Sequence, residues 1–150
     1  MAAKSSETSP ELRDLLGKEL LGDLPIKNNY DLVLLARSGV SRAVAESVIS
    51  YTGISKKKFV EEVMNLSIKT IERKQPDEKL DQRSSSLVIE VARLLEHAYR
   101  VFEDKEKVTR WLSKPNSALH NDTPLELFST PTGLGMVDDV LTRMEEGIYT

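Results

Sequence analysis

A long apolar stripe between positions 87 and 102 constrains the fold more than any other feature of the sequence. Apolar side chains recur there at alternating spacings of four and three residues, with others beside them: Leu87, Val88, Val91, Leu94, Leu95, Ala98, Val101 and Phe102. Such spacing places them on one side of an α-helix, and the stripe is wider than a two-stranded coiled-coil seam. We therefore predict a long helix that buries a broad face in a globular core. A break at 75–77 and a polar stretch through Ser86 are expected to precede it.

Helix starts and stops punctuate the rest of the chain. Residues suited to cap a helix at its N-terminus precede apolar periodic segments: Asp31, Ser41, Ser55, Asp104, Thr123 and Thr130. The first of these helices is expected to run through Arg37 and stop at Ser38-Gly39, and Gly147 is expected to close the last one. No segment combines β-branched alternation with turn residues, so we predict an all-α fold of about eight helices.

Composition favours a folded, soluble chain. Of the 150 residues 39% are hydrophobic and 30% charged, there is no cysteine, and the formal net charge is -3. No apolar run approaches the roughly 20 residues that span a bilayer, and the first residues lack a signal core, so we expect a cytoplasmic protein without membrane contact. We divide the chain into an N-terminal arm (1–29), a helix-turn-helix domain (30–80) and a C-terminal domain (81–150).

The arm carries one amphipathic segment. Positions 1–9 are polar and expected to be disordered, whereas the stretch from Pro10 to Gly22 has leucines three or four residues apart. This segment either docks on the protein's own core or binds a partner.

A basic segment from Ser55 to Gln75 has the pattern of a helix-turn-helix. It carries six basic residues against three acidic ones, and two short helices are predicted on either side of a turn at 65–67, where Asn65 tolerates a left-handed backbone. The candidate DNA-binding residues are Lys56, Lys57, Lys58, Ser67, Ile68, Lys69, Thr70 and Arg73, the last five being expected on the exposed side of a recognition helix. The alternative is a solvated basic face, and Glu61, at a position that is usually small, leaves a scaffold role open.

The sequence offers no arrangement of catalytic or metal-binding residues. His97 and His120 have no second histidine or carboxylate at ligand spacing, and Trp111 has neighbours typical of a core residue. The adjacent pairs Asp138-Asp139 and Glu145-Glu146 diverge around a helix, so a solvated face is expected for them. We predict neither enzymatic activity nor a cofactor.

The last 60 residues or so resemble the toxin-binding domain of the Xre/MbcA/ParS-like antitoxins. The matching residues stand at fixed offsets: Ala98, Phe102, Trp111, Leu112, Pro115, Asn116, Ala118, Leu119, Thr123, Pro124, Leu125, Leu127, Thr130, Gly133, Val137, Leu141, Arg143, Gly147 and Tyr149. The resemblance implies an antitoxin of a type II toxin-antitoxin pair, whose toxin is a RES-domain protein that consumes NAD or transfers ADP-ribose from it. It also implies an Xre-like DNA-binding half that represses its own operon. Because a small, modestly basic site binds DNA weakly as a monomer, we expect a homodimer on a paired operator.

The C-terminal tail is the candidate toxin-binding site. Its residues combine apolar, aromatic and charged side chains after a helix stop: Arg143, Glu146, Gly147, Ile148, Tyr149 and Thr150. Residues 116–150 carry a net charge of -5, which suits an electropositive nucleotide pocket. Three alternatives remain: a frayed terminus, a stand-alone transcription regulator whose C-terminal domain dimerises, and an interaction scaffold.

Overall fold

The computed structural model describes residues 28–147, and within this range the chain is helical and has no strand. The helical elements follow one another as α3 (Asn29–Ser38), α4 (Arg42–Ser50), α5 (Lys56–Lys58), the π-helix η2 (Phe59–Val63), α6 (Ile68–Glu72), α7 (Gln82–Phe102), α8 (Lys105–Leu112), the 3-10 helices η3 (Ser117–Leu119) and η4 (Leu125–Ser129), and α9 (Pro131–Glu145). The all-α prediction is confirmed. The predicted N-terminal amphipathic segment lies outside the described residues.

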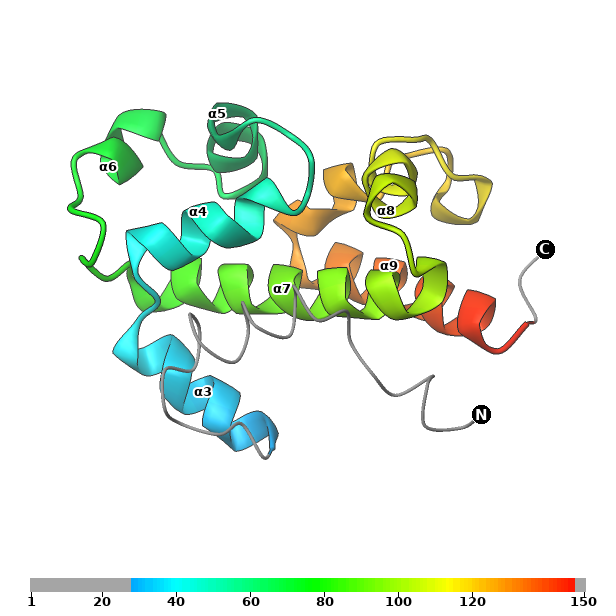
Figure 1. Ribbon diagram of the computed structural model, residues 1–150, viewed down its shortest axis with the longest axis horizontal. Coiled ribbons are helices and arrows are strands. Elements are labelled where there is room, and N and C mark those ends of the chain that lie inside the picture. The colour runs from blue at the N-terminus through cyan, green and yellow to red at the C-terminus, as the bar shows by residue number, and fades with distance from the viewer. Residues whose placement is uncertain (1–27, 148–150) are drawn as a thin grey trace.

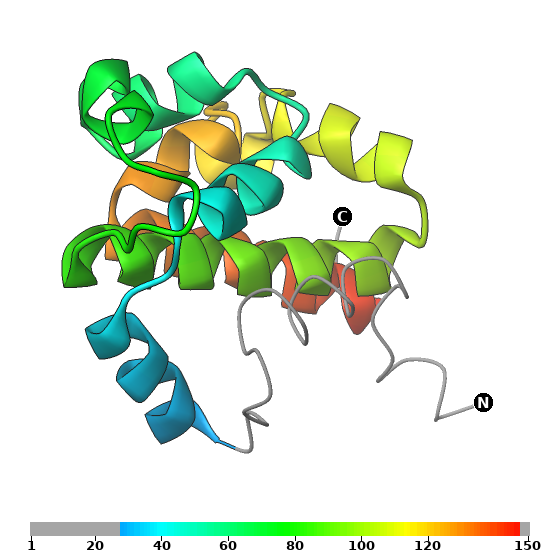
Figure 2. The same ribbon diagram turned by 60° about the vertical axis from the view of Figure 1, so that its left-hand side comes forward.

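Helix α7 is the centre of the fold. It runs through the middle of Figure 1, with α4, α5 and α6 on one side and α3 on the other, and the turned view in Figure 2 keeps this arrangement. Helices α3, α4, α8 and α9 all pack against it. Its side chains Val88, Val91, Leu95 and Ala98 have no exposed surface, as the apolar stripe predicts.

The start of α7 corrects one prediction, because the helix begins at Gln82 rather than after Ser86. The Asp81 side chain caps it by accepting a hydrogen bond from the Ser84 backbone N–H at 2.8 Å. Ser85 is fully buried, and its hydroxyl accepts from the Val40 N–H at 2.9 Å. The serines at 84–86 therefore belong to the helix. The Val40 backbone, distant in sequence, provides a partner for the buried Ser85 hydroxyl, whereas the sequence alone predicts a polar stretch outside the helix.

The other helix ends follow the predicted punctuation closely. Ser41, Ser55, Asp104 and Thr130 cap α4, α5, α8 and α9 through their side chains, as predicted. The cap of α3 was predicted wrongly. Asn28, not Asp31, accepts the capping bond, and Asp31 donates it from its backbone N–H within the first turn.

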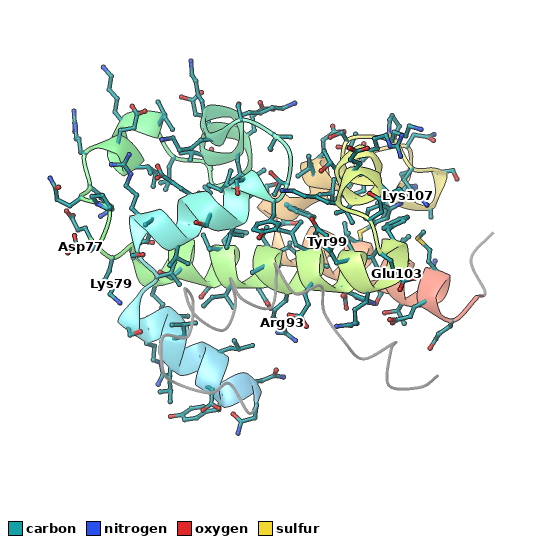
Figure 3. All side chains as sticks on the ribbon, in the orientation of Figure 1. Asp77, Lys79, Arg93, Tyr99, Glu103 and Lys107 are labelled. Carbon is teal, nitrogen blue, oxygen red and sulfur yellow. The ribbon has the colours of Figure 1, made fainter. Side chains whose placement is uncertain are left out.

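One hydrophobic core joins the N-terminal and C-terminal halves. Phe59 in η2 and Phe128 in η4 are both fully buried, and these two elements pack against each other. Tyr99 on α7 points to the α4 side (Figure 3) and meets Tyr51 edge-on at a ring distance of 6.3 Å. The two candidate sites are therefore carried on a common framework. None of the helices in residues 28–147 is long and apolar enough to cross a membrane.

Candidate functional sites

Short helical segments lie on either side of the predicted turn at 65–67: α5 with η2 before it, and α6 after it. Ser67 caps α6 by accepting from the Lys69 N–H at 3.2 Å, and Asn65 in the turn has the left-handed backbone predicted for it, with φ 58°. Glu61 is exposed, so it does not separate the two helices at their crossing.

The basic residues of this segment differ in how free they are. Lys57, Lys58, Lys69 and Arg73 are exposed, as are Ser67 and Thr70. Ile68 was expected on the exposed side, but it is half-buried and packs against the core. Lys56 is half-buried too, and its ammonium lies 2.9 Å from a Glu46 carboxylate oxygen.

A charged network holds α6 in place from α4. The Arg42 guanidinium donates to the backbone carbonyls of Glu72 at 3.2 Å and Lys74 at 2.6 Å, and to Glu46 at 3.1 Å. Burial alone would raise the pKa of Glu46, but hydrogen bonds from Lys56 and Arg42 outweigh it and lower that pKa. Glu46 is thus an ionised bridge that orients both cations, and Arg42 fixes the end of the candidate recognition helix.

The second candidate site lies at the end of α9. Thr130 caps this helix by accepting from the Gly133 N–H at 2.9 Å, and Gly147 closes it with φ 76°, as predicted. Arg143, Glu146 and Gly147 are exposed. The remaining predicted toxin-binding residues, 148–150, lie outside the described residues.

Sequence reasoning missed the surroundings of His97. The imidazole is buried, with 7% of the residue exposed, and its Nδ1 lies 2.7 Å from Asp138 Oδ1 and its Nε2 3.1 Å from Glu145 Oε1. All four acidic residues of the two pairs are exposed, as expected, and Asp138 and Glu145 in addition contact His97. Asp138 and Glu145 stand seven positions apart, almost two helical turns, and that spacing is the one sequence signal that places both on one side of α9.

One neighbouring feature fits its prediction. Trp111 is half-buried and packs on Phe102 at a ring distance of 5.5 Å, so it is part of the core. No group of histidines and carboxylates among residues 28–147 could hold a metal ion.

Comparison with known proteins identifies the class. Residues 97–147 match the family described as the antitoxin Xre/MbcA/ParS C-terminal toxin-binding domain. The chain is 27% identical over 128 residues to a protein named antitoxin Xre from Yersinia enterocolitica, an overlap of 85% of this chain and 86% of the relative. It is 34% identical over 77 residues to an antitoxin Xre from Pseudomonas putida, which covers 51% of this chain and 46% of that relative.

The matched segment makes the C-terminal part of the chain similar to the toxin-binding domain of antitoxins. By sequence, residues 97–147 are similar to the Xre/MbcA/ParS antitoxin family, which confirms the resemblance. The family and both relatives are described as antitoxins and not as enzymes.

Proposed function

We propose that this protein is the antitoxin of a type II toxin-antitoxin pair and that its C-terminal segment occludes the active site of its toxin. The toxin is a RES-type enzyme that consumes NAD or transfers ADP-ribose from it. The observation that carries the proposal is the match of residues 97–147 to a toxin-binding domain, at the end of which α9 presents exposed charges. The segment that enters the toxin consists of Arg143, Glu146, Gly147, Ile148, Tyr149 and Thr150.

The charge of the C-terminal part supports this mode of inhibition. Residues 116–150 carry a net charge of -5, and a pocket that binds a pyrophosphate is electropositive. Long-range attraction therefore steers the tail to the pocket, and the apolar Ile148 and Tyr149 fill it once they are desolvated.

The body of α9 provides a rigid base for this contact. Val137, Val140 and Leu141 are buried in the core and fix the middle of the helix, so the exposed residues after them are presented from a fixed direction. A preorganised binding segment loses less conformational entropy on association than a disordered one.

A toxicity-rescue experiment tests the proposal. The chain is expressed with the product of the adjacent gene, and NAD consumption by that product is measured with the purified pair. Deletion of residues 147–150 is expected to abolish rescue and restore NAD consumption, whereas Lys107→Ala, an exposed change on α8, leaves both as in the wild type. Full rescue by the truncated chain contradicts the proposal.

The basic face of the helix-turn-helix is the proposed contact to the operator of the protein's own operon. Lys57, Lys58, Lys69 and Arg73 are exposed on α5, α6 and the residue after it, and they contribute phosphate contacts or base readout from one face. Binding to upstream DNA is expected to weaken with salt and to fall on Arg73→Ala, but not on the control Lys107→Ala. A complete lack of salt-dependent binding favours the scaffold alternative.

Helix α3 is the proposed contact between two copies. Its exposed stripe consists of Tyr30, Val33, Leu34 and Arg37, at spacings of three and four residues. In an antiparallel pair of these helices the Tyr30 ring of one copy lies opposite the Arg37 guanidinium of the other, a cation–π arrangement. Light scattering is expected to report a dimer that Leu34→Glu converts to a monomer. A dimer unaffected by this change excludes α3 as the contact.

The stand-alone regulator is the second candidate. It predicts that the chain purifies from its native operon without a stoichiometric neighbour, whereas the antitoxin is expected to bring its toxin down with it.

A further inference from the structure

We propose that His97 is a positioning residue that, as a doubly protonated imidazolium, fixes the last turn of α9 and so aims the C-terminal segment at the toxin. The part of this inference that concerns the toxin rests on the proposed function. The part that concerns the imidazole and the last turn of α9 stands on geometry alone.

The two contacts of His97 require two protons on the ring. Its Nδ1 and Nε2 each face a carboxylate oxygen, at 2.7 Å on Asp138 and 3.1 Å on Glu145. A neutral imidazole carries one N–H, so its second nitrogen would turn a lone pair toward a negatively charged oxygen. Only the imidazolium donates to both, and hydrogen bonds between charged groups are the stronger ones.

The position of this cluster explains why it controls the tail. The buried apolar residues of α9 end at Leu141, one turn before Glu145, the last residue of the helix. Beyond Leu141, Met144 is partly buried against the core, and Glu145 contacts α7 through His97 and through Arg100, whose Nε lies 3.7 Å from Oε2. The orientation of the last turn of α9 therefore depends on Met144 and on this polar clamp.

The charges around the clamp come from both helices. On α7, Arg100 also lies 3.4 Å from Glu96, and on α9 the facing groups are Asp138 and Glu145. With His97 protonated, two cations oppose three carboxylates in this cluster. Without that proton, Arg100 is the one remaining cation, and the repulsion among the carboxylates pushes the end of α9 away from α7.

Removal of the imidazolium is therefore expected to loosen the end of α9 while the core remains folded. The last turn should exchange its amide hydrogens faster, and the affinity for the toxin should fall by roughly tenfold, the loss of a charge-assisted hydrogen bond. The buried apolar residues of α9 are unaffected. The melting temperature of the protein should therefore change little, while the amide exchange rate of the last turn rises clearly.

The experiment uses the full chain and three variants of the cluster with matched controls. His97→Gln removes the imidazolium, and Asp138→Asn and Glu145→Gln each remove one acceptor charge. His120→Asn changes the other histidine of the chain, in an exposed left-handed turn, and Asp139→Asn changes the exposed neighbour of Asp138. Asp138→Asn guards against misfolding, since 53% of its side chain is exposed.

Three measurements are made. Nitrogen NMR of the imidazoles is expected to show protons on both nitrogens of His97. Hydrogen exchange of residues 143–147 is expected to accelerate in the three cluster variants and not in the two controls. Calorimetry with the purified toxin is expected to show the roughly tenfold loss of affinity in the same variants.

The outcomes separate the inference from the proposed function. A singly protonated His97, or unchanged exchange in all three cluster variants, overturns the inference whatever the toxin does. Unchanged affinity in the variants, combined with loss of binding on deletion of residues 147–150, overturns the aiming role and leaves the proposed function intact. Unchanged affinity on that deletion overturns the proposed function, and the NMR and exchange results then decide the clamp by themselves.

Discussion

Arg42 in α4 donates a hydrogen bond from Nη1 to the backbone carbonyl of Lys74, 2.6 Å away, just beyond the end of α6. The same nitrogen lies 3.2 Å from the Glu72 carbonyl, so one guanidinium satisfies two acceptors at a helix C-terminus. Glu46 holds the guanidinium from its other side at 3.1 Å. A five-residue helix is marginal by itself, and this contact explains how α6 is held as a helix.

Arg42→Ala is expected to lower the free energy of unfolding by about 1.5–3 kcal/mol, because two carbonyls and a carboxylate lose a charged donor. Urea denaturation measures the change, and hydrogen exchange at 69–74 is expected to accelerate most. Arg93→Ala is the control, since Arg93 pairs with Glu90 at an exposed position on the side of α7 turned away from α4 (Figure 3). Arg93→Ala should lower the free energy of unfolding by less than about 0.5 kcal/mol. Equal effects of the two changes would count against the capping role.

Alanine substitutions at two glycines of α9 are expected to have opposite effects on stability. A Cβ at Gly133 would lie 2.0 Å from the Leu127 carbonyl oxygen, whereas one at Gly135 meets nothing within 4 Å. Gly133→Ala forces the backbone of η4 to move and should cost about 3 kcal/mol or more. Gly135→Ala should stabilise the helix by roughly 0.5–1 kcal/mol. Thermal melting of both variants checks this, and a tolerated Gly133→Ala would show that η4 does not lie so close to α9.

The cap of α7 is expected to make stability depend on pH. Hydrogen bonds from the Ser84 backbone N–H and side chain lower the pKa of Asp81 below its ordinary value of 3.8. Its ionised form therefore contributes stability above that value, and this contribution disappears as the pH falls through the lower pKa of the folded protein. Asp81→Ala should cost about 1 kcal/mol at neutral pH, and Asp81→Asn less, because the amide oxygen still caps.

The measurement for this prediction is urea denaturation at neutral pH and at progressively lower pH. The difference between the wild type and Asp81→Asn should shrink on acidification, while Asp139→Asn, at an exposed position, should change little at neutral pH. A difference that grows as the pH falls would contradict the sign derived for Asp81.

Unfolding is expected to be one cooperative transition across both halves. Val48 in α4 and Leu95 in α7 have no exposed surface and belong to the same core as Val140 in α9. Val48→Ala should destabilise the protein by about 2 kcal/mol. Trp111 on α8 is the one tryptophan of the sequence. Its fluorescence should show the same decrease in the free energy of unfolding as circular dichroism, which reports on all helices. Two separate transitions would show that residues 30–80 fold independently.

Most of the helices followed from local features of the sequence. Ser41, Ser55 and Thr130 were predicted as caps because a side-chain oxygen within three residues of a free N–H acts without any distant partner. The wide apolar stripe likewise marked α7 as the central helix. Asn65 was predicted to tolerate a left-handed backbone and Gly147 to close α9, since these preferences are intrinsic to the residue or its position.

The errors occurred where a residue depends on a distant part of the chain. Ser85 is helical and buried because it accepts from Val40, 45 positions earlier. Ile68 is half-buried because its helix packs back onto the core, and Lys56 is engaged by Glu46, ten positions earlier. Sequence pattern gives the chemistry of such side chains but not their partners.

The sequence by itself determined the helical class, most of the helix starts and the resemblance to the antitoxin family, because periodicity, capping and fixed residue offsets are properties of the linear chain. Only the tertiary structure decided that His97 lies between two carboxylates 41 and 48 positions away. It also decided that Arg42 caps a helix 30 residues later. The first contact forms when α7 packs against α9, and the second when the Arg42 side chain on α4 reaches the end of α6. Burial by packing selects which polar groups must pair.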